Sequence, residues 1–73
     1  MIQTSNDQFN NQLGTRLRET RETSGLSQSE LAELVGKETR VIVDMETGKR
    51  AVTATELWDL CTALNSKPFE FFI

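Results

Sequence analysis

The side chains that most often carry out acid–base, nucleophilic or metal chemistry are scarce in this chain of 73 residues. It has no histidine, the commonest general base, no tyrosine, and one cysteine, Cys61. A zinc site would need carboxylates around a single thiolate, which is an uncommon ligand set. The sequence also lacks a glycine-rich phosphate loop and a nucleophile elbow. We therefore expect a protein that is not an enzyme and that holds no metal and no cofactor.

The remaining chemistry is that of charged groups. The formal net charge of −3 argues against general adhesion to nucleic acids. However, residues 1–50 contain seven of the eight basic side chains, whereas residues 51–73 contain one basic and three acidic side chains. A surface that binds DNA would therefore be a confined patch in the first two-thirds of the chain.

Length and hydropathy favour one small intracellular domain. The N-terminal MIQTSNDQ is polar, and no apolar run approaches the length of a membrane span. A single cysteine excludes an intrachain disulfide and fits a cytoplasmic location. We expect one domain over residues 1–73, with residues 1–7 as a flexible arm, stabilised by packed helices and helped by a partner subunit.

Glycine-separated amphipathic segments predict an all-α fold of five short helices. The first spans residues 7–23 on apolar spacing. Two capping boxes, in which a hydroxyl residue precedes a glutamate by three positions, begin the helices after Ser27 and Thr53. These helices span residues 28–35 and about 54–64. The third covers residues 39–46, and a last turn follows Pro68.

The apolar positions of these helices predict the core. On the second helix they are Leu31, Ala32, Leu34 and Val35. On the third, Ile42 and Met45 point inward. On the fourth they are Leu57, Leu60, Cys61 and Leu64, so Cys61 is expected to be a small core residue.

From Leu13 to Phe72 the chain resembles the lambda-repressor and Cro type of helix-turn-helix domain, also called the Xre family. The segments that carry the resemblance are LGTRLRETRETSGLSQSELAELVG, METGKR and TELWDLCTALNSKPFEFF. The resemblance implies a compact DNA-binding domain whose recognition helix, residues 39–46, enters the major groove, which is about 12 Å wide. The implied function is a transcriptional regulator that binds a pseudo-palindromic operator in double-stranded DNA.

The resemblance also implies roles for single residues. Those expected at base edges are Thr39, Arg40, Val43 and Asp44, and those expected at phosphates are Gln28, Lys37, Lys49 and Arg50. Arg40 is the main candidate, because a guanidinium can bind guanine O6 and N7 together. Asp44 could accept from cytosine N4 or could weaken binding. The alternatives are a phosphate or solvent contact for Arg40 and a solvated turn for Lys49 and Arg50.

Two acidic residues near the recognition helix have different implied roles. In the resembling family, an arginine late in the first helix pairs with the glutamate that closes the recognition helix, which corresponds here to Arg21 and Glu46. We expect a buried ion pair of structural importance. Glu38 stands where the family usually has a serine or threonine cap, and Lys37 stands where it usually has a small aliphatic residue.

The C-terminal third predicts a homodimer. The expected interface residues are Trp58, Phe69, Phe72 and Ile73, because one short turn cannot bury so many apolar side chains alone. The small size resembles phage Cro-like repressors and controller proteins of restriction-modification systems. The alternative is a protein-binding module, such as an antitoxin with a toxin partner, for which DNA binding is secondary.

Overall fold

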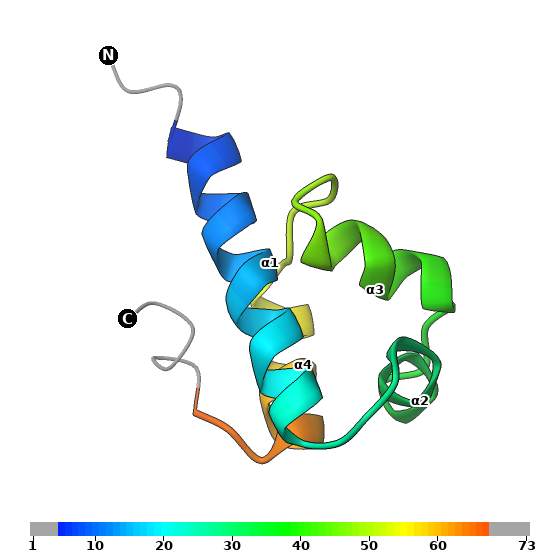
Figure 1. The fold of residues 1–73 in the computed structure, drawn as a ribbon. Helices are drawn as coiled ribbons and strands as arrows, with labels where there is room; N and C mark the ends of the chain where they lie inside the picture. The colour runs from blue at the N-terminus through cyan, green and yellow to red at the C-terminus, as the bar shows by residue number, and fades with distance from the viewer. Residues whose placement is uncertain (1–4, 68–73) are drawn as a thin grey trace.

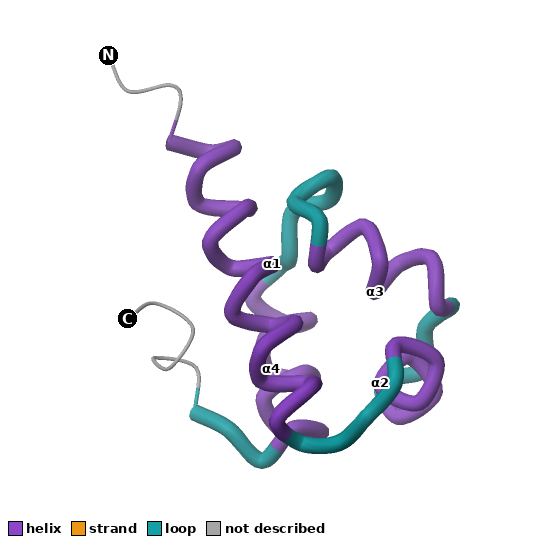
Figure 2. The backbone as a smooth tube through the Cα atoms, viewed as in Figure 1, coloured by secondary structure: helices purple, strands orange, loops and turns teal. Residues whose placement is uncertain are grey.

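This computed structural model describes residues 5–67 of the chain, which contain four helices. They are α1 (Ser5–Thr23), α2 (Gln28–Leu34), α3 (Thr39–Glu46) and α4 (Ala54–Leu64), with no strand between them (Figure 1). Figure 2 shows that the loops between the helices are short, apart from the one before α4. The predicted all-α class is confirmed. The predicted fifth helix, after Pro68, lies outside the described residues.

The observed helix boundaries differ little from the predicted ones. Helix α1 begins at Ser5, so the helix reaches into the segment expected to be an arm over residues 1–7. Residues 1–4 of that arm lie outside the described residues. Helix α2 ends at Leu34, one residue before the predicted end.

Both predicted capping boxes are present. The Ser27 hydroxyl accepts from the Glu30 amide at 3.0 Å, and the Glu30 carboxylate accepts from the Ser27 amide at 2.8 Å. Thr53 and Glu56 make the same exchange at the start of α4. These local hydrogen bonds satisfy amides that the first turn of a helix leaves without partners.

The core lies where all four helices meet. Its buried members are Leu13, Leu17, Leu31, Ala32, Ile42, Met45, Leu60, Cys61 and Leu64. The expectation that Leu34 joins them is wrong, since 59% of this residue is exposed. At 3.6 residues per turn, Leu34 lies roughly 110° from the direction midway between Leu31 and Ala32. Val35 lies close to that direction and packs against the core.

Helices α1 and α3 approach each other closely at Gly14, a position that the sequence analysis did not single out. A Cβ atom at Gly14 would lie 2.7 Å from the backbone oxygen of Glu46 and 2.9 Å from its carbonyl carbon. Such separations are below van der Waals contact, and backbone atoms cannot swing aside as a side chain can. The absence of a side chain at Gly14 therefore sets how near α3 lies to α1.

We expect Gly14→Ala to lower the free energy of unfolding by about 1–3 kcal/mol, because the added methyl overpacks a backbone contact. This should happen even though alanine favours an isolated helix by about 1 kcal/mol over glycine. Urea denaturation followed by circular dichroism measures the change. Gln12→Ala, at an exposed position of the same helix, is the control. A Gly14→Ala variant as stable as the wild type would contradict the close approach.

Candidate nucleic-acid interface

Helices α2 and α3 form a compact unit joined by a tight turn. Gly36 adopts a positive φ of 70°, and the amide of Lys37 donates to the carbonyl of Ala32 at 2.9 Å, which closes α2. Beyond the turn, the Ser29 and Thr39 hydroxyls lie 3.2 Å apart in a hydrogen bond. The start of α3 is thereby tied to the first turn of α2.

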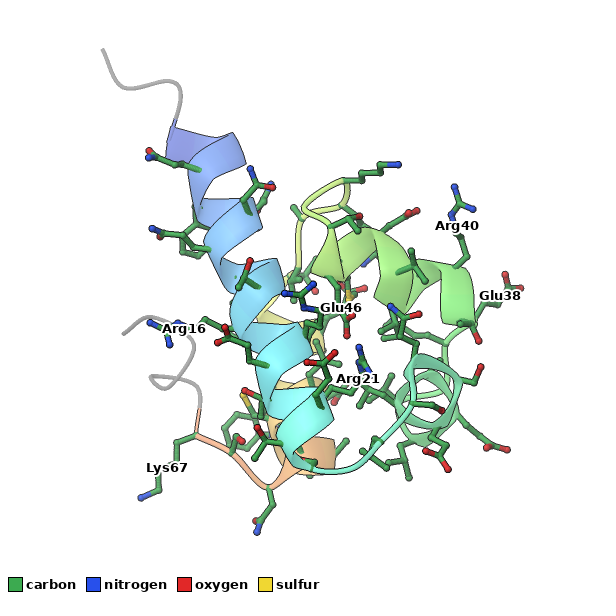
Figure 3. The ribbon with its side chains drawn as sticks, in the orientation of Figure 1. Arg16, Arg21, Glu38, Arg40, Glu46 and Lys67 are labelled. Carbon is green, nitrogen blue, oxygen red and sulfur yellow. The ribbon has the colours of Figure 1, made fainter. Side chains whose placement is uncertain are left out.

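An ion pair fixes the other end of α3. Arg21 Nε donates to Glu46 Oε2 at 2.6 Å and Nη2 donates to Glu46 Oε1 at 3.1 Å. The third nitrogen, Nη1, donates to the carbonyl of Leu26 at 2.9 Å, and Gln28 Nε2 donates to Glu46 Oε1 at 3.0 Å. Both charged residues are buried, and Figure 3 shows them facing each other between α1 and α3. The structure thus brings together the two residues expected to pair.

The electrostatics of this pair favour its charged form. The hydrogen bonds that Arg21 donates to Glu46 raise the pKa of the Arg21 guanidinium above its usual value, against the opposing effect of burial. The Glu22 carboxylate, 3.9 Å from Arg21 Nη2, acts in the same direction. A paired, hydrogen-bonded charge tolerates burial, whereas a single buried charge does not.

We expect Arg21→Met to cost about 3–5 kcal/mol of unfolding free energy, because it leaves the Glu46 carboxylate buried without its countercharge. The double variant Arg21→Met, Glu46→Met should be more stable than Arg21→Met alone. Chemical denaturation of both single variants and the double variant measures the coupling. If the two single losses simply add in the double variant, the pair is not coupled.

A second charge cluster surrounds Glu56, the third residue of α4. Arg50 donates to both Glu56 carboxylate oxygens, at 3.0 and 2.7 Å, and Lys37 Nζ lies 3.2 Å from Oε2. Lys37 precedes α3 and Arg50 follows it, so one carboxylate holds both flanks of α3 to α4. The structure therefore gives Lys37 and Arg50, both expected at phosphates, an internal partner. The expected phosphate contacts of these two residues stay predictions.

Glu56 was expected only as a capping residue. Its side chain is 11% exposed, and the hydrogen bonds from Arg50 are the main cause that lowers its pKa from 4.5 to about 2; bonds from Thr53 and Lys37 add to this and burial opposes it. In the same pair, the hydrogen bond to Glu56 raises the pKa of Arg50. The sequence signal for the capping box was local, whereas the two cations come from positions 37 and 50.

The depressed pKa of Glu56 predicts an acid-sensitive contribution to stability. The contribution is complete above pH 4.5 and is lost as the pH falls toward 2, because the folded state then binds a proton less readily than the unfolded state. Glu56→Gln should lower the stability at pH 7 and flatten the pH dependence in this window.

Glu30→Gln is the matched control for this prediction. Glutamine can keep either capping box, but only Glu56 holds Lys37 and Arg50. Urea denaturation of both variants at intervals between pH 7 and pH 2.5 measures the difference. Equal pH profiles for Glu56→Gln and Glu30→Gln would contradict the assignment.

The outward side of α3 carries the residues expected to read bases. Thr39 and Arg40 are exposed, and Val43 and Asp44 are half-buried. Figure 3 shows Arg40 pointing away from the body of the protein. Ile42 and Met45 are fully buried on the inward side, as expected.

Lys49 and Gln28, also expected at phosphates, lie outside α3. Lys49 is exposed in the turn after α3, where its amide donates to the carbonyl of Asp44 at 2.9 Å. Gln28 donates from Nε2 to Glu46 Oε1, so its side chain is held against the end of α3. Its expected phosphate contact stays a prediction.

Among residues 5–67, no helix is long and apolar enough to cross a membrane, and no cluster of side chains fits a metal ion.

A short outward helix, fixed at its end by a buried ion pair and joined by a tight turn to the helix before it, defines the helix-turn-helix class of DNA-binding regulators. A family model described as a helix-turn-helix domain matches residues 12–68. The chain belongs to this helix-turn-helix domain family, which confirms the resemblance drawn from the sequence.

Solved structures of regulators share this fold. The restriction-modification controller protein C.AhdI from Aeromonas hydrophila is 40% identical, with a TM-score of 0.81 over 85% of this chain and 94% of that chain. The clp gene regulator ClgR from C. glutamicum is 26% identical, with a TM-score of 0.85 over 88% of this chain and 83% of that chain. An HTH_3 family transcriptional regulator from Vibrio cholerae is 27% identical, with a TM-score of 0.85 over 92% of this chain and 38% of that chain. No curated protein matches the chain.

Proposed function

We propose that this chain is a homodimeric transcriptional regulator that reads a pseudo-palindromic DNA operator with α3. The observation that carries the proposal is the outward face of α3, with Thr39, Arg40, Val43 and Asp44 on a helix fixed by Arg21 and Glu46. A rigid helix of this length fits the major groove, where base edges differ in their donors and acceptors. Such a protein regulates and does not catalyse, and it acts in the cytoplasm.

Phosphate contacts would flank the base-reading face. Lys49 is the clearest candidate, because it is exposed directly after α3. Lys37 and Arg50 would reach phosphates only by sharing or leaving Glu56. Gln28, at the first turn of α2, would position that helix across the backbone, where a contact fixes orientation without reading sequence.

A dimer would supply the second recognition helix. A single α3 covers only a few base pairs, whereas a two-fold dimer places two such helices about 34 Å apart on one face of the duplex. Trp58 is 65% exposed, Leu34 is 59% exposed, and both line an open groove. The groove is lined by Leu34, Val35, Trp58, Asp59, Thr62 and Ala63. Phe69, Phe72 and Ile73, expected in the same interface, lie outside the described residues.

The regulatory setting is inferred from the similar structures. The 40% identity to C.AhdI, across most of both chains, supports a role like that of a restriction-modification controller. None of the structures named above is described as an antitoxin. The alternative of a toxin-binding module therefore gains no support from them.

Selection of DNA from a random library tests the proposed function. We expect the wild type to enrich an inverted repeat whose half-site centres are separated by about one helical turn. Arg40→Ala should weaken binding to that site by about 1–3 kcal/mol and remove the preference at one base pair of each half-site. Lys49→Ala should weaken all sequences similarly and reduce the salt slope by about one unit.

Variants of the groove separate dimerisation from base reading. Trp58→Glu should give a monomer in sedimentation equilibrium and weaken binding to the full site more than to a half-site. Thr55→Glu, which adds the same charge at an exposed position of α4, is the control. A wild type that enriches no sequence, or that stays monomeric on its site at high micromolar concentration, would contradict the proposal.

A further inference from the structure

An arginine and an aspartate of α3 are joined on its outward face. Arg40 Nε donates to Asp44 Oδ1 at 3.2 Å, one helical turn further along. The Asp44 side chain is 28% exposed and the Arg40 side chain is 76% exposed. The carboxylate is thus the anchored member of the pair, and the guanidinium is the member that projects into solvent.

The backbone of Asp44 is fixed independently of its side chain. Its carbonyl accepts from the amides of Lys49 and Arg50, at 2.9 and 3.2 Å, in the turn that ends α3. A substitution at position 44 leaves these backbone contacts in place. The backbone from which the Asp44 carboxylate projects is therefore set by the folded end of α3.

The use of Nε decides what remains for a ligand. A guanidinium has five N–H donors in a fixed planar fork, and only one of them is on Nε. With Nε bound to Asp44, the two terminal nitrogens carry the other four donors, and Figure 3 shows the end of the Arg40 side chain pointing away from the helix. Two parallel donors of this kind match the O6 and N7 acceptors of guanine.

We propose that Asp44 is a positioning residue that holds Arg40 for guanine and does not itself read a base. The proposal rests on the proposed function, because it assigns Asp44 a part in the reading of DNA by α3. It also explains an acidic side chain on a face that approaches phosphates. The contact with Arg40 partly neutralises the Asp44 carboxylate, which reduces its repulsion of DNA phosphates. The same contact restricts the rotamers of the Arg40 side chain before DNA binds.

Two substitutions of Asp44 separate its hydrogen bond from its charge. Asp44→Ala and Asp44→Asn both remove the negative charge, but only asparagine keeps an oxygen that accepts from Nε. We expect Asp44→Ala to lower the preference for guanine at the Arg40 position about fivefold, which is less than the loss in Arg40→Ala, because the guanidinium is still present but no longer held. Asp44→Asn should restore most of that preference. Both variants should bind non-specific DNA more tightly than the wild type.

The base pair that changes distinguishes the two roles of Asp44. Library selection with Arg40→Ala and with Asp44→Ala should relax the same base pair. Relaxation of a different base pair by Asp44→Ala would show that Asp44 reads a base directly and would overturn the proposal. Equal preferences in Asp44→Ala and Asp44→Asn would also overturn it, because the effect would then be one of charge. Glu19→Ala, which removes an exposed carboxylate from α1, controls for net charge.

A measurement without DNA keeps this proposal apart from the proposed function. In the NMR spectrum of the DNA-free protein, the Arg40 Nε–H signal should be shifted and protected from exchange with water. Asp44→Ala should abolish both effects and Asp44→Asn should retain the protection. An unprotected Arg40 Nε–H signal in the DNA-free wild type would overturn the proposal, whether or not the protein is found to select a DNA sequence. A protected signal in a protein that selects no DNA sequence would refute the proposed function instead.

Discussion

The buried contact between Arg21 and Glu46 determines where α3 can lie. Arg21 is in the last turn of α1 and Glu46 is the last residue of α3. The same cluster includes Gln28, at the first position of α2, and the Leu26 carbonyl in the preceding loop. A buried guanidinium and a buried carboxylate are each costly without the other. Other placements of α3 would therefore separate the charges, and the close contact at Gly14 limits its distance from α1.

Net charge is a poor description of this protein, because several of its charges are satisfied within the fold. Glu46 forms an ion pair with Arg21, and Asp44 forms one with Arg40. Glu56 forms ion pairs with both Lys37 and Arg50. Each of these three carboxylates near α3 is thus partly neutralised by a cation at short range. A DNA phosphate lies farther away, so solvent and salt screen its interaction with the same carboxylate. These pairs also use four of the eight basic side chains, so they leave the overall charge of −3 unchanged and lower only the repulsion that each paired carboxylate would exert on DNA.

Local sequence signals predicted the helices well, and contacts between distant residues were less accessible. The capping boxes at Ser27 and Thr53 involve residues three positions apart, so their spacing was sufficient. The pairing of Arg21 with Glu46 came from the resemblance to a known family and not from periodicity. The cluster at Glu56 joins residues from three segments, and no local pattern indicates it. The sequence did contain one signal for the close approach at Gly14. A glycine inside a helical pattern often has a packing reason.

The two ends of α3 are held in different ways, and this bears on how DNA would be read. The C-terminal end is fixed by the buried Glu46, whereas the N-terminal cap, Glu38, makes no side-chain hydrogen bond to the helix. That end is held by the exposed hydroxyl contact between Ser29 and Thr39 and, just before the helix, by the partly exposed ion pair of Lys37 with Glu56. Arg40 lies in this less restrained first turn, and it contacts Asp44 one turn further along, close to the end of α3 that Glu46 fixes. The position of the Arg40 guanidinium therefore depends on the buried end of the helix.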